Sequence, residues 1–96
     1  MAIENKVALV TGAGQGIGRG IALRLANDGA SLMLVYVKRE GLDAVAAEVK
    51  ALGRQVATFV ADIADREQVY EAVNQAESQL GGFDIIEIGA GDHYRA

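Results

Sequence analysis

One stretch near the N-terminus decides the fold: Lys6-Val7-Ala8-Leu9-Val10-Thr11-Gly12-Ala13-Gly14-Gln15-Gly16-Ile17-Gly18. Its first six residues contain the continuous apolar run Val7–Val10, which is typical of a strand covered on both faces and usually parallel to its neighbours. The rest is a glycine-rich turn that leads into a segment with helical periodicity. A turn in this position presents free backbone N–H groups and the positive end of a helix dipole to an anion.

Three glycines of the turn have separate predicted roles. Gly12 permits a tight exit from the strand, Gly16 lets the backbone approach a phosphate, and Gly18 lets the helix pack closely on the strand. The strand–turn–helix context favours a cradle for the pyrophosphate of a dinucleotide over a glycine turn without a ligand. The motif lacks the Lys-Ser/Thr ending of a nucleoside triphosphate loop, which argues against an ATPase or a GTPase.

Further apolar runs alternate with helical patterns along the chain. Strands are expected at 31–37, 56–60 and 83–88. The helical stripes are Ile17, Ile21 and Leu25; then Leu42, Val45, Ala46, Val49 and Leu52; then Val69, Ala72, Val73, Ala76 and Leu80. Asp65 and Gln68 resemble a capping box at the start of the third helix, and Gly29, Gly53 and Gly81-Gly82 follow the three helices.

This alternation predicts an α/β half-Rossmann fold: a four-stranded parallel sheet of order 3-2-1-4 with three helices. We expect residues 1–96 to form one domain, with the first two helices on one face of the sheet and the third on the other. The uncovered part of that second face, around Val10 and Ile85, predicts self-association as a homo-oligomer.

Composition restricts the possible partners and location. The 96 residues are 51% hydrophobic and 23% charged, and the net charge is −4 with a pI of about 4.8. This acidic balance argues against binding to nucleic acid or to an anionic membrane. The absence of cysteine, of a signal-peptide pattern and of any apolar run near ~20 residues favours a cytoplasmic protein without a membrane segment.

Three segments together resemble the short-chain dehydrogenase/reductase family over residues 3–86. They are Thr11-Gly12-x3-Gly16-Ile17-Gly18, Ala61-Asp62-Ile63 and Gly81-Gly82-Phe83-Asp84. Within the family the chain looks most like acetoin (diacetyl) reductases and 2,3-butanediol dehydrogenases. The resemblance implies a bound NAD or NADP.

The resemblance also implies a set of cofactor-binding residues. Asp62 would accept a hydrogen bond from the adenine amino group beside Ile63, although a solvated carboxylate at a strand end is the alternative. Ala90 and Gly91 match the end of the segment that lines the adenosine ribose, or else form a flexible tail, and Gly89 directly before them is a further candidate cofactor-binding residue. The pyrophosphate and the nicotinamide ribose would be surrounded by Gly12, Gln15, Gly16, Ile17 and Gly18.

Tyr36 departs from the family pattern. It ends the second predicted strand, where the NAD-preferring members that the chain resembles carry Asp, so the carboxylate that would hold the 2′-hydroxyl and repel a 2′-phosphate is missing. Lys38 and Arg39 follow it; they either accept a 2′-phosphate, which would admit NADP, or only solvate the next helix. The choice between NAD and NADP stays open.

The C-terminal segment departs as well. Glu87-Ile88-Gly89 replaces the family's Val-Asn-Asn, and a Glu there suits an edge strand better than a central one. His93 is best interpreted as a solvated residue and not as a metal ligand.

The family's catalytic Ser and Tyr-x-x-x-Lys are not found in these 96 residues, since Glu40 and Asn74 stand four positions after Tyr36 and Tyr70, and Tyr94 has no lysine there. The expected function is therefore an NAD(P)-binding fragment that is catalytically silent alone. The alternatives are an enzyme completed by another chain, or an engineered or truncated self-associating scaffold with a vestigial nucleotide site.

Overall fold

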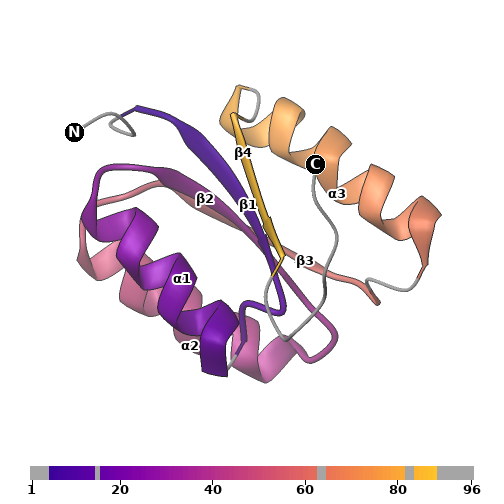
Figure 1. The fold of residues 1–96 in the computed structure, drawn as a ribbon, viewed down its shortest axis with the longest axis horizontal. Coiled ribbons are helices and arrows are strands. Elements are labelled where there is room, and N and C mark those ends of the chain that lie inside the picture. The colour runs from indigo at the N-terminus through magenta and orange to yellow at the C-terminus, as the bar shows by residue number, and fades with distance from the viewer. Residues whose placement is uncertain (1–4, 15, 63–64, 82–83, 89–96) are drawn as a thin grey trace.

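The computed structural model describes residues 5–14, 16–62, 65–81 and 84–88. Strands and helices alternate along the whole of this chain (Figure 1). The elements are β1 (Val7–Thr11), α1 (Gly16–Asn27), β2 (Ser31–Tyr36), α2 (Arg39–Ala51), β3 (Val56–Val60), α3 (Arg66–Leu80) and β4 (Ile85–Ile88).

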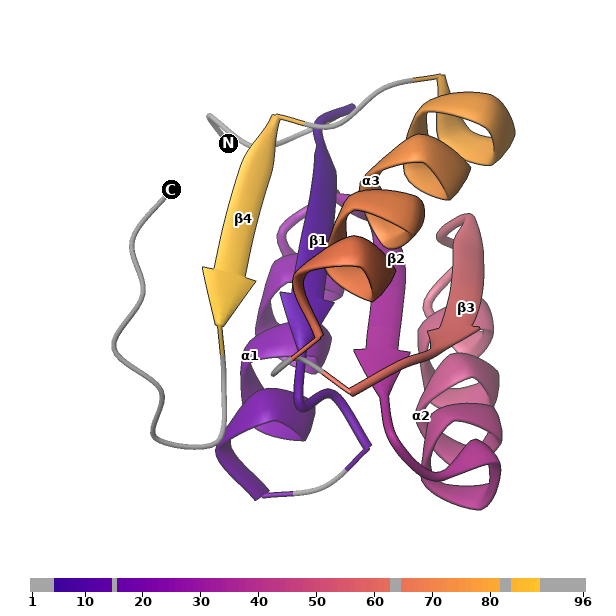
Figure 2. The ribbon, with the colours of Figure 1, turned by 90° about the vertical axis from the view of Figure 1, so that its right-hand side faces the viewer.

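The four strands form one parallel sheet in the order β3-β2-β1-β4, as the sequence predicts (Figure 2). β1 lies between β2 and β4, so the glycine turn leaves an interior strand of the sheet. Within the described part of the chain β4 has one neighbour, and Glu87 pairs in register with Val10. β4 is therefore an edge strand here, as expected, and it begins at Ile85, two residues later than the predicted range of 83–88.

Two apolar clusters cover the two faces of the sheet. One joins α1 and α2 to alternate residues of β1 and β2, including Ala8, Val10 and Leu34. The other joins α3 to the intervening residues, including Leu9 and Met33. The predicted distribution of helices, two on one face and one on the other, is thus confirmed (Figure 2).

Val10 corrects one expectation. The sequence interpretation placed it in an uncovered apolar patch, but its side chain is completely buried under α1 and α2. Successive side chains of a strand point to opposite faces of the sheet. Because every residue of a continuous apolar run is hydrophobic, the run does not indicate which of its side chains face α1 and α2 and which face α3.

The buried face of α1 also differs from the predicted stripe of Ile17, Ile21 and Leu25. Ile17 is 68% exposed, while Gly18, Ala22 and Ala26 are buried. These small residues recur every four positions and let the helix axis approach the sheet closely. The larger side chains are displaced to the flanks of the contact, where Ile21 and Leu25 are partly buried.

Asp65 caps the N-terminus of α3, as predicted. Its carboxylate accepts hydrogen bonds from the backbone N–H groups of Glu67 and Gln68, at 3.0 and 3.3 Å. The reciprocal half of the capping box does not form, because the side-chain oxygen of Gln68 accepts instead from the backbone N–H of Asp62, at 2.8 Å. At the other end Gly81 has the left-handed φ of 85° that ends a helix.

Asp84 fastens the start of β4 to the start of β1. Its backbone N–H donates to the carbonyl of Val7 at 2.7 Å, and its carboxylate accepts from the N–H of Val7 at 2.9 Å. The first residue of a strand at the sheet end otherwise has few partners for its backbone, so this exchange satisfies both groups of Val7.

None of the described helices combines the length and the apolarity needed to cross a membrane.

Candidate nucleotide-binding site

The glycine turn lies at the carboxyl end of β1, where ligands bind in open α/β sheets. Gly12 and Gly16 have φ values of 64° and 57°, a region that residues with a Cβ rarely adopt. The backbone N–H of Ala13 donates to the carbonyl of Val35 at 3.1 Å and ties the turn to β2. The backbone conformation itself therefore favours glycine at positions 12 and 16.

Gly18 makes the closest approach in the turn. A Cβ built on it would lie 1.9 Å from the carbonyl oxygen of Gly12, so the first turn of α1 folds directly against the exit of β1. At Gly16 the opposite holds, because a Cβ there would meet no atom of the described part of the chain within 4 Å. The backbone is thus tightly packed where Gly18 meets Gly12 and open in front of Gly16. The opening fits a ligand with a bulky anionic group.

The charges around the start of α1 also fit an anion. The first turn of the helix carries no acidic residue. Arg19 is held by α2, since its Nε and Nη2 donate to the two carboxylate oxygens of Glu48 at 2.9 and 2.5 Å. These hydrogen bonds and the charge of Glu48 raise the pKa of Arg19 above its usual value. The backbone N–H groups and the helix dipole remain as the features that attract an anion here.

Thr11 ends β1 immediately before the turn. It is 2% exposed, and its Oγ1 has no hydrogen-bond partner among the described residues. A buried hydroxyl without a partner is costly, and such groups concentrate at functional sites. Sequence reasoning treated Thr11 only as part of the family motif and did not identify this hydroxyl.

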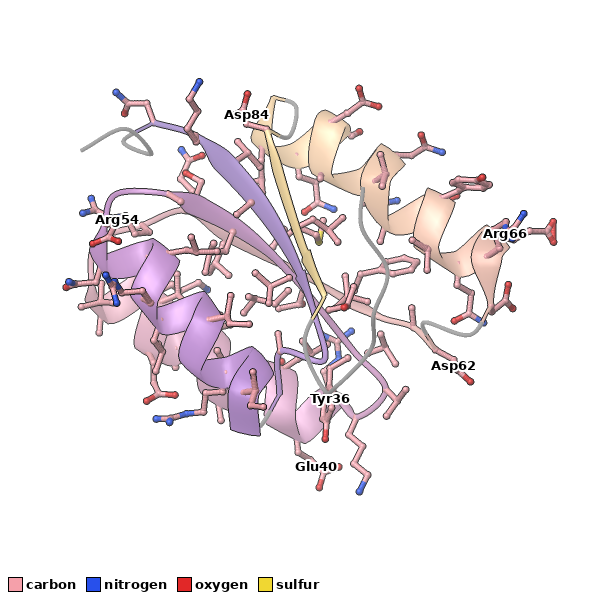
Figure 3. The ribbon with its side chains drawn as sticks, in the orientation of Figure 1. Tyr36, Glu40, Arg54, Asp62, Arg66 and Asp84 are labelled. Carbon is pink, nitrogen blue, oxygen red and sulfur yellow. The ribbon has the colours of Figure 1, made fainter. Side chains whose placement is uncertain are left out.

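Tyr36 lies at the carboxyl end of β2, beside the turn (Figure 3). Its partly buried ring packs against the backbone of Gly14 and against Gly41 in the first turn of α2. The sequence interpretation considered Tyr36 only as the replacement of a carboxylate. It did not predict that the ring would fill the space between the glycine turn and α2.

The two basic residues after Tyr36 differ in their surroundings. The Nη1 of Arg39 donates to the Oγ1 of Thr58 at 2.9 Å and lies 3.6 Å from a carboxylate oxygen of Asp43, so its guanidinium is directed along α2 and β3. Lys38 is exposed and forms no ion pair with the described residues. Of the two cations, Lys38 is thus the one left available to a phosphate.

Asp62 follows β3 and is exposed, at the same end of the sheet as Tyr36 (Figure 3). Gln68 holds its backbone N–H, which fixes the path of the chain between β3 and α3. The structure therefore brings five of the predicted site residues to the carboxyl end of the sheet. They are Gly12, Gly16, Gly18, Tyr36 and Asp62. The other predicted site residues lie outside the described residues, namely Gln15, Ile63, Gly89, Ala90 and Gly91; Ile17 is described and is largely exposed.

Sequence reasoning missed Gly14 and Gly41 as members of this region. A signal was present at position 41, because a glycine within a helix weakens it by about 1 kcal/mol and often marks a close approach of another backbone.

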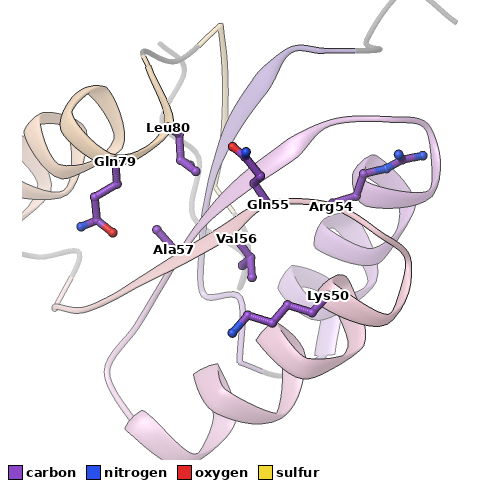
Figure 4. A pocket seen from close by; sticks show the side chains of 7 residues that line it. All are labelled: Lys50, Arg54, Gln55, Val56, Ala57, Gln79 and Leu80. Carbon is purple, nitrogen blue, oxygen red and sulfur yellow. The ribbon is translucent and has the colours of Figure 1, made fainter.

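A groove of about 360 Å³ lies away from the glycine turn, beside β3 (Figure 4). None of its described lining residues belongs to the predicted nucleotide site. They are Lys50, Arg54, Gln55, Val56, Ala57, Gln79 and Leu80.

Together these features define a Rossmann-type nucleotide-binding unit: a parallel βαβ unit, a glycine turn after its first strand, and site residues at the carboxyl end of the sheet. The family profile of short chain dehydrogenases matches residues 6–95. The chain therefore belongs to the short-chain dehydrogenase/reductase family.

Individual relatives share much of this sequence. 2-Dehydro-3-deoxy-D-gluconate 5-dehydrogenase of Pseudoalteromonas atlantica is 43% identical over 96 residues, which cover 98% of this chain and 37% of that protein. Estradiol 17-beta-dehydrogenase 11 of Homo sapiens is 36% identical over 92 residues, covering 96% of this chain and 31% of that protein. The chain thus spans about a third of the length of these curated relatives.

Solved structures agree with the fold. Carveol dehydrogenase from Mycobacterium avium, in complex with NAD, superposes with a TM-score of 0.87 at 35% identity; the match covers 93% of this chain and 36% of that one. An NAD⁺-bound xylitol dehydrogenase gives a TM-score of 0.84 at 35% identity, covering 90% and 33%.

Proposed function

We propose that this chain is the NAD(P)-binding part of a short-chain dehydrogenase/reductase. The observation that carries the proposal is the glycine turn, which is closed by the contact between Gly18 and Gly12 and open in front of Gly16. The NAD complexes of carveol dehydrogenase and xylitol dehydrogenase support the same class of cofactor.

Different residues of the chain would bind different parts of the cofactor. The backbone N–H groups at Gly16 and the start of α1 would hold the pyrophosphate, while Tyr36 and Asp62 would border the adenosine. Lys38 is the cation placed to favour a 2′-phosphate, and no carboxylate at position 36 opposes one, so both NAD and NADP are admitted. A bound nicotinamide dinucleotide supplies hydride transfer.

We expect these 96 residues to bind a cofactor without turning over a substrate. The Ser and Tyr-x-x-x-Lys of the family are not found among them, so they hold no equivalent general acid for carbonyl reduction. Likeness to acetoin (diacetyl) reductases and 2,3-butanediol dehydrogenases suggests small hydroxyketones or diketones as the substrates of a completed site. Turnover of acetoin or diacetyl by the purified chain alone would overturn this expectation.

Calorimetric titration with NAD and with NADP tests the proposal. Gly16→Ala should weaken both by at least tenfold, because the methyl group strains the backbone and occupies the open space. Gly53→Ala is the matched control: its φ is 83° and its Cβ also meets nothing within 4 Å, but it follows α2. The control should lose similar stability, about 1 kcal/mol, and keep its affinity.

The second candidate is a scaffold whose nucleotide site is vestigial. Absence of heat with either dinucleotide would favour it. Self-association through the sheet and a cytoplasmic location remain predictions. The position of β4 at the sheet edge supports self-association, and sedimentation at micromolar concentration tests it.

A further inference from the structure

Three segments meet at the ring of Tyr36. A Cβ on Gly14 would lie 2.1 Å from Cδ2, 2.4 Å from Cε2 and 2.7 Å from Cγ of this ring. A Cβ on Gly41 would lie 3.0 Å from Cε2 of the ring and 3.0 Å from the carbonyl oxygen of Gly14. The glycine turn, the end of β2 and the first turn of α2 are therefore in direct contact at one point.

The two glycines are needed for space and not for backbone freedom. Neither Gly14 nor Gly41 has a positive φ, so an alanine at either position is conformationally allowed. At Gly14 the three nearest atoms to the missing Cβ all belong to the Tyr36 ring. The Tyr36 ring thus limits how closely the Gly14 backbone can approach the end of β2.

We propose that Tyr36 is a positioning residue that supports the glycine turn through Gly14, with Gly41 completing the contact from α2. This inference rests on the proposed function, because the supported turn is the one that would hold the pyrophosphate. It assigns the Tyr36 side chain a role that does not require a contact with the 2′ position. The pyrophosphate is common to NAD and NADP, so the support acts on both cofactors alike.

Replacements of Tyr36 separate support from direct recognition. Tyr36→Phe is the conservative variant: it keeps the ring and should therefore lose much less affinity for either cofactor than a variant without the ring. Tyr36→Val removes the ring and should weaken NAD and NADP by the same factor, tenfold or more. Unchanged affinities in Tyr36→Val, or a loss for one of the two cofactors alone, would overturn the proposal, because the ring would then not act on the turn that holds their common pyrophosphate.

A double-mutant cycle tests the contact itself. Gly14→Ala should weaken both cofactors at least tenfold, because the new methyl group displaces the turn from the Tyr36 ring. Adding Tyr36→Val removes the obstacle, so the double variant should bind better than the product of the two single effects predicts. Gly20→Ala adds the same methyl group to α1 where it meets nothing within 4 Å, and it should bind normally. Purely multiplicative effects would refute the support.

A readout without cofactor distinguishes failure of this inference from failure of the proposed function. The Tyr36 ring should shift the Hα resonances of Gly14 and Gly41 in the free protein, and these shifts should persist in Tyr36→Phe and vanish in Tyr36→Val. If the original chain binds neither dinucleotide, the proposed function fails while these shifts still decide whether the ring contacts the turn. Unshifted resonances in the original chain would refute the contact.

Discussion

Gly18→Ala tests most directly how α1 is attached to the sheet. The added Cβ would lie 1.9 Å from the carbonyl oxygen and 2.5 Å from the carbonyl carbon of Gly12, whereas ordinary contact begins near 3.4 Å. Both obstacles are backbone atoms, which cannot rotate away as a side chain can. The helix must therefore move by about 1.5 Å, a distance close to the rise of one helical residue.

The cost follows from this displacement. Overpacking of a well-packed interior costs about 1–3 kcal/mol, and a backbone obstacle puts Gly18→Ala towards the upper end. The better helix propensity of alanine returns up to about 1 kcal/mol, so the net loss should be near 2 kcal/mol. For a domain of this size, that corresponds to a fall in Tm of roughly 8–16 °C.

Gly20→Ala is the control within the same helix. Its Cβ meets nothing within 4 Å, so the propensity gain stands alone and the variant should be as stable as the original chain or up to about 1 kcal/mol more stable. Urea denaturation followed by circular dichroism measures both variants. Equal stability of Gly18→Ala and Gly20→Ala would refute the close approach of α1 to β1.

Three further changes test other contacts by the same denaturation. Asp84→Ala removes the acceptor for the Val7 N–H and should cost about 1–3 kcal/mol, while Asp84→Asn keeps an acceptor oxygen and should cost less; equal losses would contradict the assignment. Asp65→Ala should cost about 1 kcal/mol through the lost helix cap, whereas Asp65→Asn should be nearly neutral, and the reverse order would exclude capping. Arg54→Met removes the hydrogen bond from Nε to the carbonyl of Ala26, 2.7 Å long, and should cost about 1–2 kcal/mol; an unchanged midpoint would count against this bond.

Local patterns were sufficient to predict the architecture. Continuous apolar runs at 31–37 and 56–60 identified two parallel strands, and glycines 29, 53 and 81 marked helix ends at which the structure has positive φ values. The expected burial holds for β2 but not for β3, which ends the strand order and keeps only Ala57 buried. These features depend on each segment's own period and backbone freedom. The right-handed crossover of β-α-β units and the short connections between elements then left few strand orders to consider.

Contacts between segments were harder to predict. Ile17 belongs to an apolar stripe but is exposed, because the small residues beside it let α1 approach the sheet more closely than large ones would. The contact of the Tyr36 ring with Gly14 and Gly41 depends on the distance between three elements. No periodicity within one segment encodes such a distance, so only the assembled fold reveals it.

The exchange of hydrogen bonds between Val7 and Asp84 also bears on synthesis and folding. Its two residues are 77 positions apart, so closing this loop costs roughly 4 kcal/mol of chain entropy before any contact compensates it. A ribosome adding about 5–20 residues per second needs roughly 4–15 seconds to produce the second partner after the first. During that interval the edge of β1 that later receives β4 has no native strand to pair with. The nascent chain is then most exposed to wrong strand pairing, and a chaperone would protect it most effectively at this stage.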